Sequence, residues 1–262
     1  MITDHFLVTD QVAVITGAGR GIGRASALAL AEAGADLVIS ARSTEQLEEV
    51  VAAAASFGRR CIAIPADLND LDSLPPLVEA AKSEFGRLDI VVNNVGGSFP
   101  RPLLQTSAAM FEKAFHFNVT TALELSKAAI PVMLEGDGGS IVNISSAIGR
   151  MTDRGFAAYG TAKGALTHLT RLMATECAPR VRVNGIAVGS VATSALDMVL
   201  TDEALRTTME TNTPLGRLGD PLDIALGVLY LCSPAGSYLT GKIIEIDGGL
   251  TAPSLALGLP DL

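Results

Sequence analysis

A tyrosine and a lysine four residues apart are the first residues of this sequence whose types and spacing suggest chemistry. Tyr159-Gly160-Thr161-Ala162-Lys163 opens a stretch that continues at helical spacing through Leu166 and Leu169. Residues four apart share one face of a helix, so the phenol and the ammonium can share a site. A phenol titrates near about pH 10, and an adjacent ammonium favours the phenolate. The pair therefore predicts a proton donor usable near neutral pH, with a purely structural pair as the alternative.

Two serines precede this pair at the end of an apolar run. Asn143-Ile144-Ser145-Ser146 closes the fifth of the strands expected below, thirteen residues before Tyr159. Open α/β sheets bind ligands at the carboxyl ends of their strands, so we expect Ser146 to hydrogen-bond a substrate oxygen there. Either serine alone is more typical of a cap at the end of an element. The combination with Tyr159 and Lys163 favours catalysis.

A glycine-rich turn near the start of the chain predicts a nucleotide site. The run Thr16-Gly17-Ala18-Gly19-Arg20-Gly21-Ile22-Gly23 follows an apolar strand and opens a helix that Gly34 ends. Glycines allow the tight turn and let the backbone approach a pyrophosphate, which the first N–H groups of the helix and its dipole bind. The strand, turn, helix and second strand together are typical of a dinucleotide-binding unit, the alternative being a turn without a ligand.

The end of the second strand favours NADP(H), with NAD(H) as the other possibility. An acidic residue there would bind the ribose 2′-hydroxyl of NAD, whereas this sequence has Ser40-Ala41-Arg42-Ser43. Arg42, with Arg20 of the glycine turn, can pair with the 2′-phosphate of NADP. The alternative for Arg42 is a solvated residue at the start of a helix.

The elements that must position these residues alternate between short apolar strands and longer helical stretches. Parallel strands that are buried on both faces have such unbroken apolar runs, and the sheet they form needs helices on both sides. We therefore expect a doubly wound α/β fold in one domain over residues 1–262. The expected strands are Val12–Thr16, Leu37–Ser40, Cys61–Ile64, Ile90–Asn93, Ser140–Ile144, Val181–Ala187 and Ile243–Ile246.

Composition excludes several other classes of protein. The 262 residues include 19 basic and 28 acidic ones, a net charge of −9 that argues against binding nucleic acid or an anionic membrane. Three cysteines and three histidines without metal-type spacing indicate neither a metal site nor disulfides. An uncharged stretch at 224–241 is broken by Ser233, Pro234 and Gly236, which indicates a buried helix and a turn. The acidic start of the chain lacks the pattern of a signal peptide, and we expect a cytoplasmic protein.

Several motifs in order resemble the short-chain dehydrogenase/reductase family over about residues 8 to 250. Besides the glycine turn and Tyr159-x-x-x-Lys163, these are Asn93-Asn94-Val95-Gly96, Asn118 in a long helix, and Ile246-Asp247-Gly248-Gly249. The resemblance implies a catalytic tetrad of Ser146, Tyr159, Lys163 and Asn118, with Asn118 holding a water that connects Lys163 to solvent.

The same resemblance implies the residues that contact the cofactor. Asp67 and Leu68 are expected at the adenine, Asn94 and Gly96 along the cofactor, Lys163 at the nicotinamide ribose, and Val191 and Thr193 at the nicotinamide amide. Together with the glycine turn and Arg42, the expected contacts are Gly17, Gly19, Arg20, Gly21, Ile22, Gly23, Arg42, Asp67, Leu68, Asn94, Gly96, Tyr159, Lys163, Val191 and Thr193.

The chain departs from the family pattern at two positions. Val95 stands where the family usually has alanine, and Val188-Gly189 replaces the usual Pro-Gly pair after the sixth strand. Loss of a proline frees a backbone φ, so we expect a looser loop on the nicotinamide side of the site.

The expected reaction is hydride transfer between a nicotinamide cofactor and a carbonyl carbon, with Tyr159 exchanging the proton. The lid expected at 194–213 carries the apolar residues Leu196, Met198, Val199 and Leu200. These residues predict an apolar ketone as the substrate, and the alternative is that they only pack the lid onto the core. Three short motifs resemble the 7α-hydroxysteroid dehydrogenase branch: Asn94-Val95-Gly96-Gly97, Thr193-Ser194-Ala195-Leu196 and Leu231-Cys232-Ser233-Pro234-Ala235. The alternatives are a 3-oxoacyl carrier-protein reductase, for which Arg101, Arg150, Arg154 and Arg171 are candidate docking residues, and a non-catalytic NADP sensor or scaffold.

The resemblance also implies a homo-oligomer, a tetramer or a dimer. Family members assemble through two long helices, here about 108–134 and 157–177. The tail at 252–262 is apolar and covers a neighbour's pocket or is disordered; the sequence does not decide between them.

Overall fold

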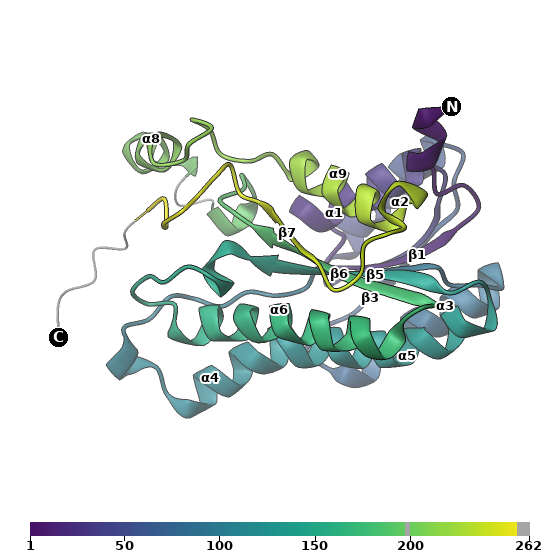
Figure 1. The fold of residues 1–262 in the computed structure, drawn as a ribbon, viewed down its shortest axis with the longest axis horizontal. Coiled ribbons are helices and arrows are strands. Elements are labelled where there is room, and N and C mark those ends of the chain that lie inside the picture. Colours follow the sequence, from purple (N-terminus) through teal and green to yellow (C-terminus); the bar gives the residue numbers. More distant parts are fainter. Residues whose placement is uncertain (197–199, 256–262) are drawn as a thin grey trace.

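A computed structural model describes residues 1–196 and 200–255, which are built around one seven-stranded parallel sheet (Figure 1). The strand order is β3-β2-β1-β4-β5-β6-β7, which confirms the predicted doubly wound fold. Each predicted strand is present, with ends that differ by at most two residues. The strands are β1 (Val12–Thr16), β2 (Asp36–Ala41), β3 (Cys61–Pro65), β4 (Ile90–Asn93), β5 (Gly139–Ser146), β6 (Val181–Val188) and β7 (Ile243–Ile246).

Helices cover both faces of the sheet and make two apolar cores with it. Alternate residues of one strand belong to different cores: Ala13 and Ile15 of β1 face α1, α2 and α9, whereas Val12 and Val14 face α3, α5 and α6. Figure 1 shows these two helical layers above and below the sheet. The helices of these layers are α1 (Gly21–Glu32), α2 (Thr44–Ser56), α3 (Pro75–Phe85), α5 (Thr121–Glu135), α6 (Ala157–Cys177) and α9 (Pro221–Cys232). A further helix, α4 (Ala108–Phe115), precedes α5.

The order of the strands reverses between β1 and β4, which places the ends of these two strands at the ligand-binding edge of the sheet. β1 pairs with β2 on one side and with β4 on the other, all in parallel. The chain leaves β1 into the glycine turn and leaves β4 into Asn94 and Gly96. A doubly wound sheet opens a crevice at such a reversal, because successive connections leave in opposite directions there.

The long helix predicted at 108–134 is two helices joined by a π-helical turn. α4 ends at Phe115, the turn spans His116–Thr120, and α5 begins at Thr121. The turn contains Asn118, whose side chain is fully buried. The helical prediction is therefore right in extent and wrong in continuity. The second predicted long helix is α6, with the predicted bounds.

The predicted lid at 194–213 contains a short 3-10 helix, Ser194–Leu196, and α8 (Glu203–Thr211). Leu196 and Leu200 pack with Met209, Leu218 and other apolar side chains, as expected for residues that hold this segment together. Met198 and Val199 lie outside the described residues. Of the tail, residues 252–255 are described, and the Ser254 and Ser190 hydroxyls are 2.8 Å apart.

Three further features concern the described part of the chain. None of the helices within it has the length and apolar character needed to cross a membrane. α9 ends at Cys232 and is followed by a turn at Pro234–Gly236, as predicted. Within residues 1–196 and 200–255, no group of histidine, cysteine and acidic side chains is arranged to hold a metal ion.

Candidate active site

The glycine turn after β1 is held in a shape that only glycine permits at two positions. Gly17 has a φ of +64°, and a Cβ on Gly23 would lie 2.2 Å from the carbonyl oxygen of Gly17. The side-chain amide of Asn94 donates to the carbonyl of Thr16 at 2.9 Å and to that of Gly17 at 3.3 Å. Asn94 therefore fixes the turn from the end of β4. The turn and the N-terminus of α1 form a cradle for a pyrophosphate, so these residues fit a dinucleotide.

Thr193 lies against the same turn from the other side. A Cβ on Gly21 would lie 3.2 Å from the Thr193 methyl group, so the segment after β6 reaches the start of α1. Val191 is buried and bridges to Gly219. The structure thus brings both residues expected at the nicotinamide to the carboxyl end of the sheet.

The loop after β3 carries the residues expected at the adenine. Backbone and side-chain N–H groups of Asn69 are the main reason that the pKa of Asp67 lies below its usual value, and Arg42 and Lys113 lower it further. Arg42 is exposed at the end of β2. Arg42 and Asp67, predicted from separate motifs, therefore share one electrostatic neighbourhood.

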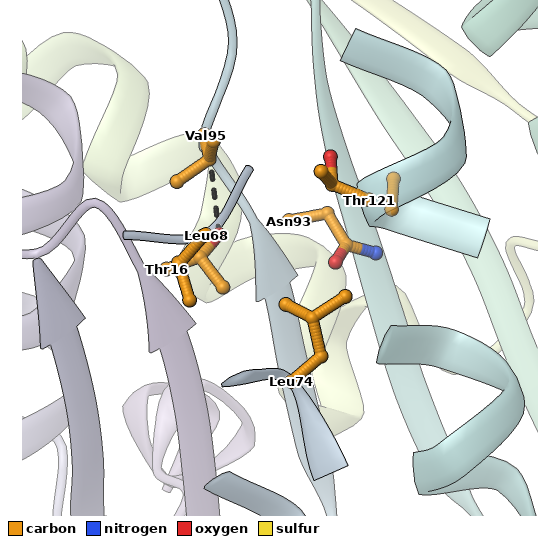
Figure 2. A pocket seen from close by; sticks show the side chains of 7 residues that line it. Thr16, Leu68, Leu74, Asn93, Val95 and Thr121 are labelled. Carbon is orange, nitrogen blue, oxygen red and sulfur yellow. Dashed lines mark hydrogen bonds between the residues drawn. The ribbon is translucent and has the colours of Figure 1, made fainter. Parts of the chain in front are cut away.

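Leu68 is buried at a small cavity of about 10 Å³ between the ends of β1 and β4 (Figure 2). This volume corresponds to about one water molecule. Thr16, Asn93 and Thr121 supply polar atoms to its wall, and the Thr16 hydroxyl accepts a hydrogen bond from the Val95 N–H at 3.2 Å, the dashed line of Figure 2. The cavity lies beneath the crevice and is too small for a nucleotide.

β5 and α6 bring Ser146, Tyr159 and Lys163 together. Ser146 is the last residue of β5, its hydroxyl accepts the Ile148 N–H at 3.3 Å, and it also hydrogen-bonds the Tyr159 phenol. Lys163 is 3% exposed, and its Nζ donates to the Ile144 carbonyl at 2.8 Å. The Nζ lies 5.8 Å from the centre of the Tyr159 ring. Serine, phenol and ammonium thus line one end of the strand and helix.

The pKa of Tyr159 is displaced in the direction opposite to the expected one. Burial raises the pKa of the phenol, and the hydrogen bond from Ser146 offsets this in part. Burial also lowers the pKa of Lys163 to about 8. Desolvation, which the sequence does not reveal, is the largest cause of both shifts.

Asn118 reaches the site from the π-helical turn. Its Oδ1 accepts the Gly97 N–H at 2.9 Å, and its Nδ2 donates to the carbonyls of Gly97 and Ala114, at 3.0 and 2.8 Å. Both Nδ2 hydrogens are therefore used within the protein. A Cβ on Gly96 would lie 2.6 Å from Asn118 Oδ1 and 2.8 Å from Lys163 Nζ, so Asn118 and Lys163 both lie beside Gly96.

Val188, which stands in place of the usual proline, lies at the end of β6. Val188 continues β6 and pairs with Ile246 of β7, and the Gly189 N–H donates to the Ile246 carbonyl at 3.1 Å. A Cβ on Gly189 would lie 2.5 Å from the Cα of Asp247. Val188 therefore belongs to β6, which ends one residue later than predicted, and the looser loop after it stays a prediction.

Sequence reasoning missed several polar contacts around the site. The Ser145 hydroxyl donates to the Lys163 carbonyl at 3.0 Å and contacts the Thr167 hydroxyl at 3.0 Å. Deeper in the sheet, the Asn93 amide donates to Asn143 at 2.8 Å, and the Asn143 amide donates to Thr170 at 2.9 Å. A signal was present: polar residues in otherwise apolar buried strands need partners.

Arg150, one of the candidate docking residues for a carrier protein, is used within the chain. Its guanidinium contacts Glu245 at 3.0 Å and Asp247 at 2.5 Å, and it donates to the Leu250 carbonyl at 2.8 Å. These contacts connect the turn after Ser146 to the segment after β7. Arg101 and Arg171 are exposed.

The family model described as enoyl-(acyl carrier protein) reductase matches residues 17–251. The chain is 56% identical to an uncharacterized oxidoreductase of Mycobacterium tuberculosis over 263 residues, with all of both chains covered. It is 37% identical to the 7alpha-hydroxysteroid dehydrogenase of Escherichia coli over 94% of this chain and 96% of that one. A solved 7alpha-hydroxysteroid dehydrogenase, complexed with NADH and 7-oxo glycochenodeoxycholic acid, superposes with a TM-score of 0.90 at 36% identity, covering 94% of this chain and 96% of that one.

The fold, the motifs in order and these matches over nearly the whole chain agree with one another. The chain belongs to the short-chain dehydrogenase/reductase family and is an NAD(P)(H)-dependent oxidoreductase that acts on CH–OH donors.

Proposed function

We propose that Ser146, Tyr159, Lys163 and Asn118 carry out the interconversion of a secondary alcohol and a ketone in this enzyme. The observation that carries this proposal is the position of Tyr159 and Lys163. Both lie on one face of α6 beside Ser146, and the Lys163 ammonium lies next to Gly96 and Asn118 at the edge of the cofactor crevice. Those residues give a proton donor, a hydrogen-bond donor and a buried cation at one point.

Each of these side chains has a distinct part in the proposed mechanism. The bound cofactor supplies or accepts the hydride. The Ser146 hydroxyl orients the substrate oxygen, and the Tyr159 phenol donates its proton to that oxygen during reduction or removes it during oxidation. Lys163, held by the Ile144 carbonyl, stabilises the phenolate and binds the nicotinamide ribose. Asn118 holds the Gly96–Gly97 backbone beside the ammonium.

We propose a preference for NADP(H) over NAD(H). The residues at the end of β2 supply Arg42 and no carboxylate, and Arg20 lies in the glycine turn. A guanidinium pairs with a phosphate through charge-assisted hydrogen bonds that a ribose hydroxyl does not provide. The relative solved with NADH shows the same fold, so the preference depends on these side chains rather than on the architecture.

We propose an apolar, steroid-like ketone or alcohol as the substrate. The likeness to 7alpha-hydroxysteroid dehydrogenase supports this class. The segment 194–213 serves as the substrate lid, and its described leucines belong to a packed apolar cluster. The carrier-protein alternative is weakened because Arg150 is paired with Glu245 and Asp247 and is not available to an acidic partner.

We further propose that residues 1–262 act as one domain in a cytoplasmic homo-oligomer built through α4, α5 and α6. Large apolar side chains are exposed on these helices, among them Met110, Phe111 and Phe115 on α4, Leu134 on α5 and Leu172 on α6. Contiguous exposed apolar surface is typical of protein interfaces. Three unpaired cysteines fit a reducing compartment.

The test measures oxidation of NADPH and of NADH by the purified protein against steroid ketones, simple aromatic ketones and a 3-oxoacyl thioester. We expect NADPH-linked turnover with a steroid ketone and a loss of about 10³-fold in kcat in Tyr159→Phe, while NADPH binding is retained. Best turnover of the thioester would favour the carrier-protein alternative. Binding of NADPH without turnover of any ketone would favour the non-catalytic sensor.

A further inference from the structure

β5 and α6 are joined by a series of polar contacts that runs from the core to the site. Each of the last four residues of β5 contributes at least one contact to α6, and the partners lie between Tyr159 and Thr170. The contacts are Asn143 Nδ2 to Thr170 Oγ1 at 2.9 Å, the Ile144 carbonyl to Lys163 Nζ at 2.8 Å, Ser145 Oγ to the Lys163 carbonyl and to Thr167 Oγ1 at 3.0 Å each, and Ser146 to the Tyr159 phenol.

The contacts of Ser145 differ from the others because they fix the backbone of α6. A serine hydroxyl has one hydrogen, and Ser145 uses it for the Lys163 carbonyl, so it accepts the hydrogen of the Thr167 hydroxyl. Ser145 is 3% exposed. Buried hydroxyls whose hydrogen bonds are all made restrict the two elements that they join.

The backbone of the turn after Ser146 packs closely against the same part of α6. A Cβ on Gly149 would lie 2.9 Å from the carbonyl carbon of Lys163, and one on Gly164 would lie 3.2 Å from the Gly149 carbonyl oxygen. The turn and the helix therefore meet almost without intervening side chains. Small shifts of α6 along its axis are transmitted directly to Ser146.

We propose that Ser145 and Thr167 are positioning residues of the hydride-transfer reaction. They fix the position of the Tyr159–Lys163 turn, along the axis of α6, relative to Ser146. This inference rests on the proposed function. The reaction needs the phenol, the serine hydroxyl and the ammonium in one arrangement around a single oxygen atom. A displacement of about 1 Å is enough to cost a large part of the rate, although no group that touches the substrate is lost.

The experiment compares five variants with the wild-type protein. Ser145→Ala removes both contacts, Thr167→Val removes only the hydroxyl at nearly constant shape, and Thr167→Ser keeps the hydroxyl; the double variant Ser145→Ala/Thr167→Val tests whether the contacts are coupled. Thr175→Val is the matched control, since Thr175 lies on α6 and its hydroxyl donates to the Arg171 carbonyl one turn earlier. Steady-state kcat and KM, the pH profile of kcat, thermal unfolding and the Kd of NADPH are measured for each.

We expect kcat to fall about tenfold in Ser145→Ala and about threefold to tenfold in Thr167→Val, with KM and the Kd of NADPH within about twofold. The alkaline limb of the pH profile shifts in both, because the distance from Tyr159 to Lys163 and Ser146 changes. Thr167→Ser and Thr175→Val retain wild-type kinetics. The double variant is no worse than Ser145→Ala, since both substitutions break one connection.

The inference is overturned if Ser145→Ala and Thr167→Val keep the wild-type kcat and pH profile, or if Thr167→Ser loses as much as Thr167→Val. The second result would show that the methyl group, not the hydroxyl, is needed. If Ser145→Ala does not fold, the two Thr167 variants decide the question by themselves. A wild-type protein without turnover would overturn the proposed function, and this inference with it.

Discussion

Asn118 and Gly97 exchange two hydrogen bonds across 21 residues of sequence. The Gly97 N–H donates to Asn118 Oδ1 at 2.9 Å, and Asn118 Nδ2 donates to the Gly97 carbonyl at 3.0 Å. This pair holds the backbone after β4 against the π-helical turn and places Gly96 beside Lys163. The family resemblance implies that Asn118 holds a water molecule. The geometry adds a second role, in which the Asn118 amide holds the backbone that forms one side of the site.

The first prediction concerns Gly96. A Cβ there would meet Asn118 Oδ1 at 2.6 Å and Lys163 Nζ at 2.8 Å, so Gly96→Ala should displace the ammonium and lower kcat by about 10²-fold. Gly136→Ala is the control, because the nearest atom to its Cβ is 3.8 Å away. Steady-state kinetics of both variants check this, and unchanged turnover in Gly96→Ala would contradict it.

The second prediction concerns the cost of burying Lys163. Its pKa is lowered from 10.5 to about 8, which corresponds to roughly 3 kcal/mol of destabilisation wherever the group is charged in both states. Lys163→Met loses one hydrogen bond to Ile144, worth about 1 kcal/mol, and should therefore raise the free energy of unfolding at pH 7 by about 1–2 kcal/mol while it abolishes turnover.

The stability gained by Lys163→Met depends on pH in a definite direction. Between about pH 8 and pH 10.5 the unfolded chain binds the lysine proton and the folded chain has lost it, so the stability of the wild-type protein rises with pH and the advantage of Lys163→Met shrinks. Urea unfolding at pH 7 and at about pH 9.5 measures both effects. Lys127→Met, at an exposed lysine paired with Glu124, should change little. A less stable Lys163→Met at pH 7 would contradict the prediction.

The third prediction concerns the pH dependence of alcohol oxidation. Oxidation requires the phenolate of Tyr159, and burial raises the pKa of this group while Ser146 lowers it. The rate of oxidation should therefore keep rising with pH on the alkaline side of the pH profile. In Ser146→Ala this alkaline limb should shift to still higher pH, whatever the loss in maximal rate. A limb that stays in place or moves downward in this variant would show that Ser146 does not act on the phenol.

The fourth prediction concerns the choice of cofactor. Removal of a charge-assisted contact in Arg42→Ala should raise the Kd of NADPH by about tenfold to 10²-fold and leave that of NADH within about twofold. Arg60→Ala is the control, because Arg60 precedes β3 at the opposite end of the sheet. Fluorescence titrations with both cofactors measure the difference, and equal losses for NADPH and NADH would exclude a 2′-phosphate contact.

The fifth prediction concerns assembly. Light scattering should give a multiple of the 27.0 kDa chain mass, and Phe111→Glu/Leu172→Glu should shift it toward the mass of a single chain. These side chains are 38% and 50% exposed on α4 and α6. Phe57→Glu, at the end of α2, is the matched control and should keep the wild-type mass. A single 27.0 kDa species in the wild-type protein would exclude an oligomer.

Local sequence patterns predicted the architecture because the apolar runs of the sequence are the segments that the fold buries. The strands are mostly apolar runs, and Ser145 and Ser146 stand at the carboxyl end of β5, so strand positions and site residues could be found together. The Ala-rich helix α1 was less informative. Its buried residues include Gly23, Ala27 and Leu30, whereas Ile22, Ala25 and Ala29 are partly buried, so small residues occur on both sides of the helix.

What the sequence could not predict depends on partners that are distant along the chain. The π-helical turn contains neither proline nor glycine, and Asn118 is held there by Gly97 as well as by Ala114. The raised pKa of Tyr159 comes from packing that exists only in the folded protein. The contact of Ser145 with Thr167 requires the register between β5 and α6, which no local pattern encodes.

The π-helical turn at His116–Thr120 also constrains how this stretch tolerates insertions and deletions. A wider turn accommodates one more residue than an α-helix does, and each residue of an α-helix advances by about 100° around the axis. Deleting one residue from this turn would let α4 and α5 join with ordinary α-helical spacing in their present orientation. The deletion would remove the widened turn that holds Asn118, so Asn118 would no longer lie opposite Gly97. The length of this stretch is therefore as constrained as its composition.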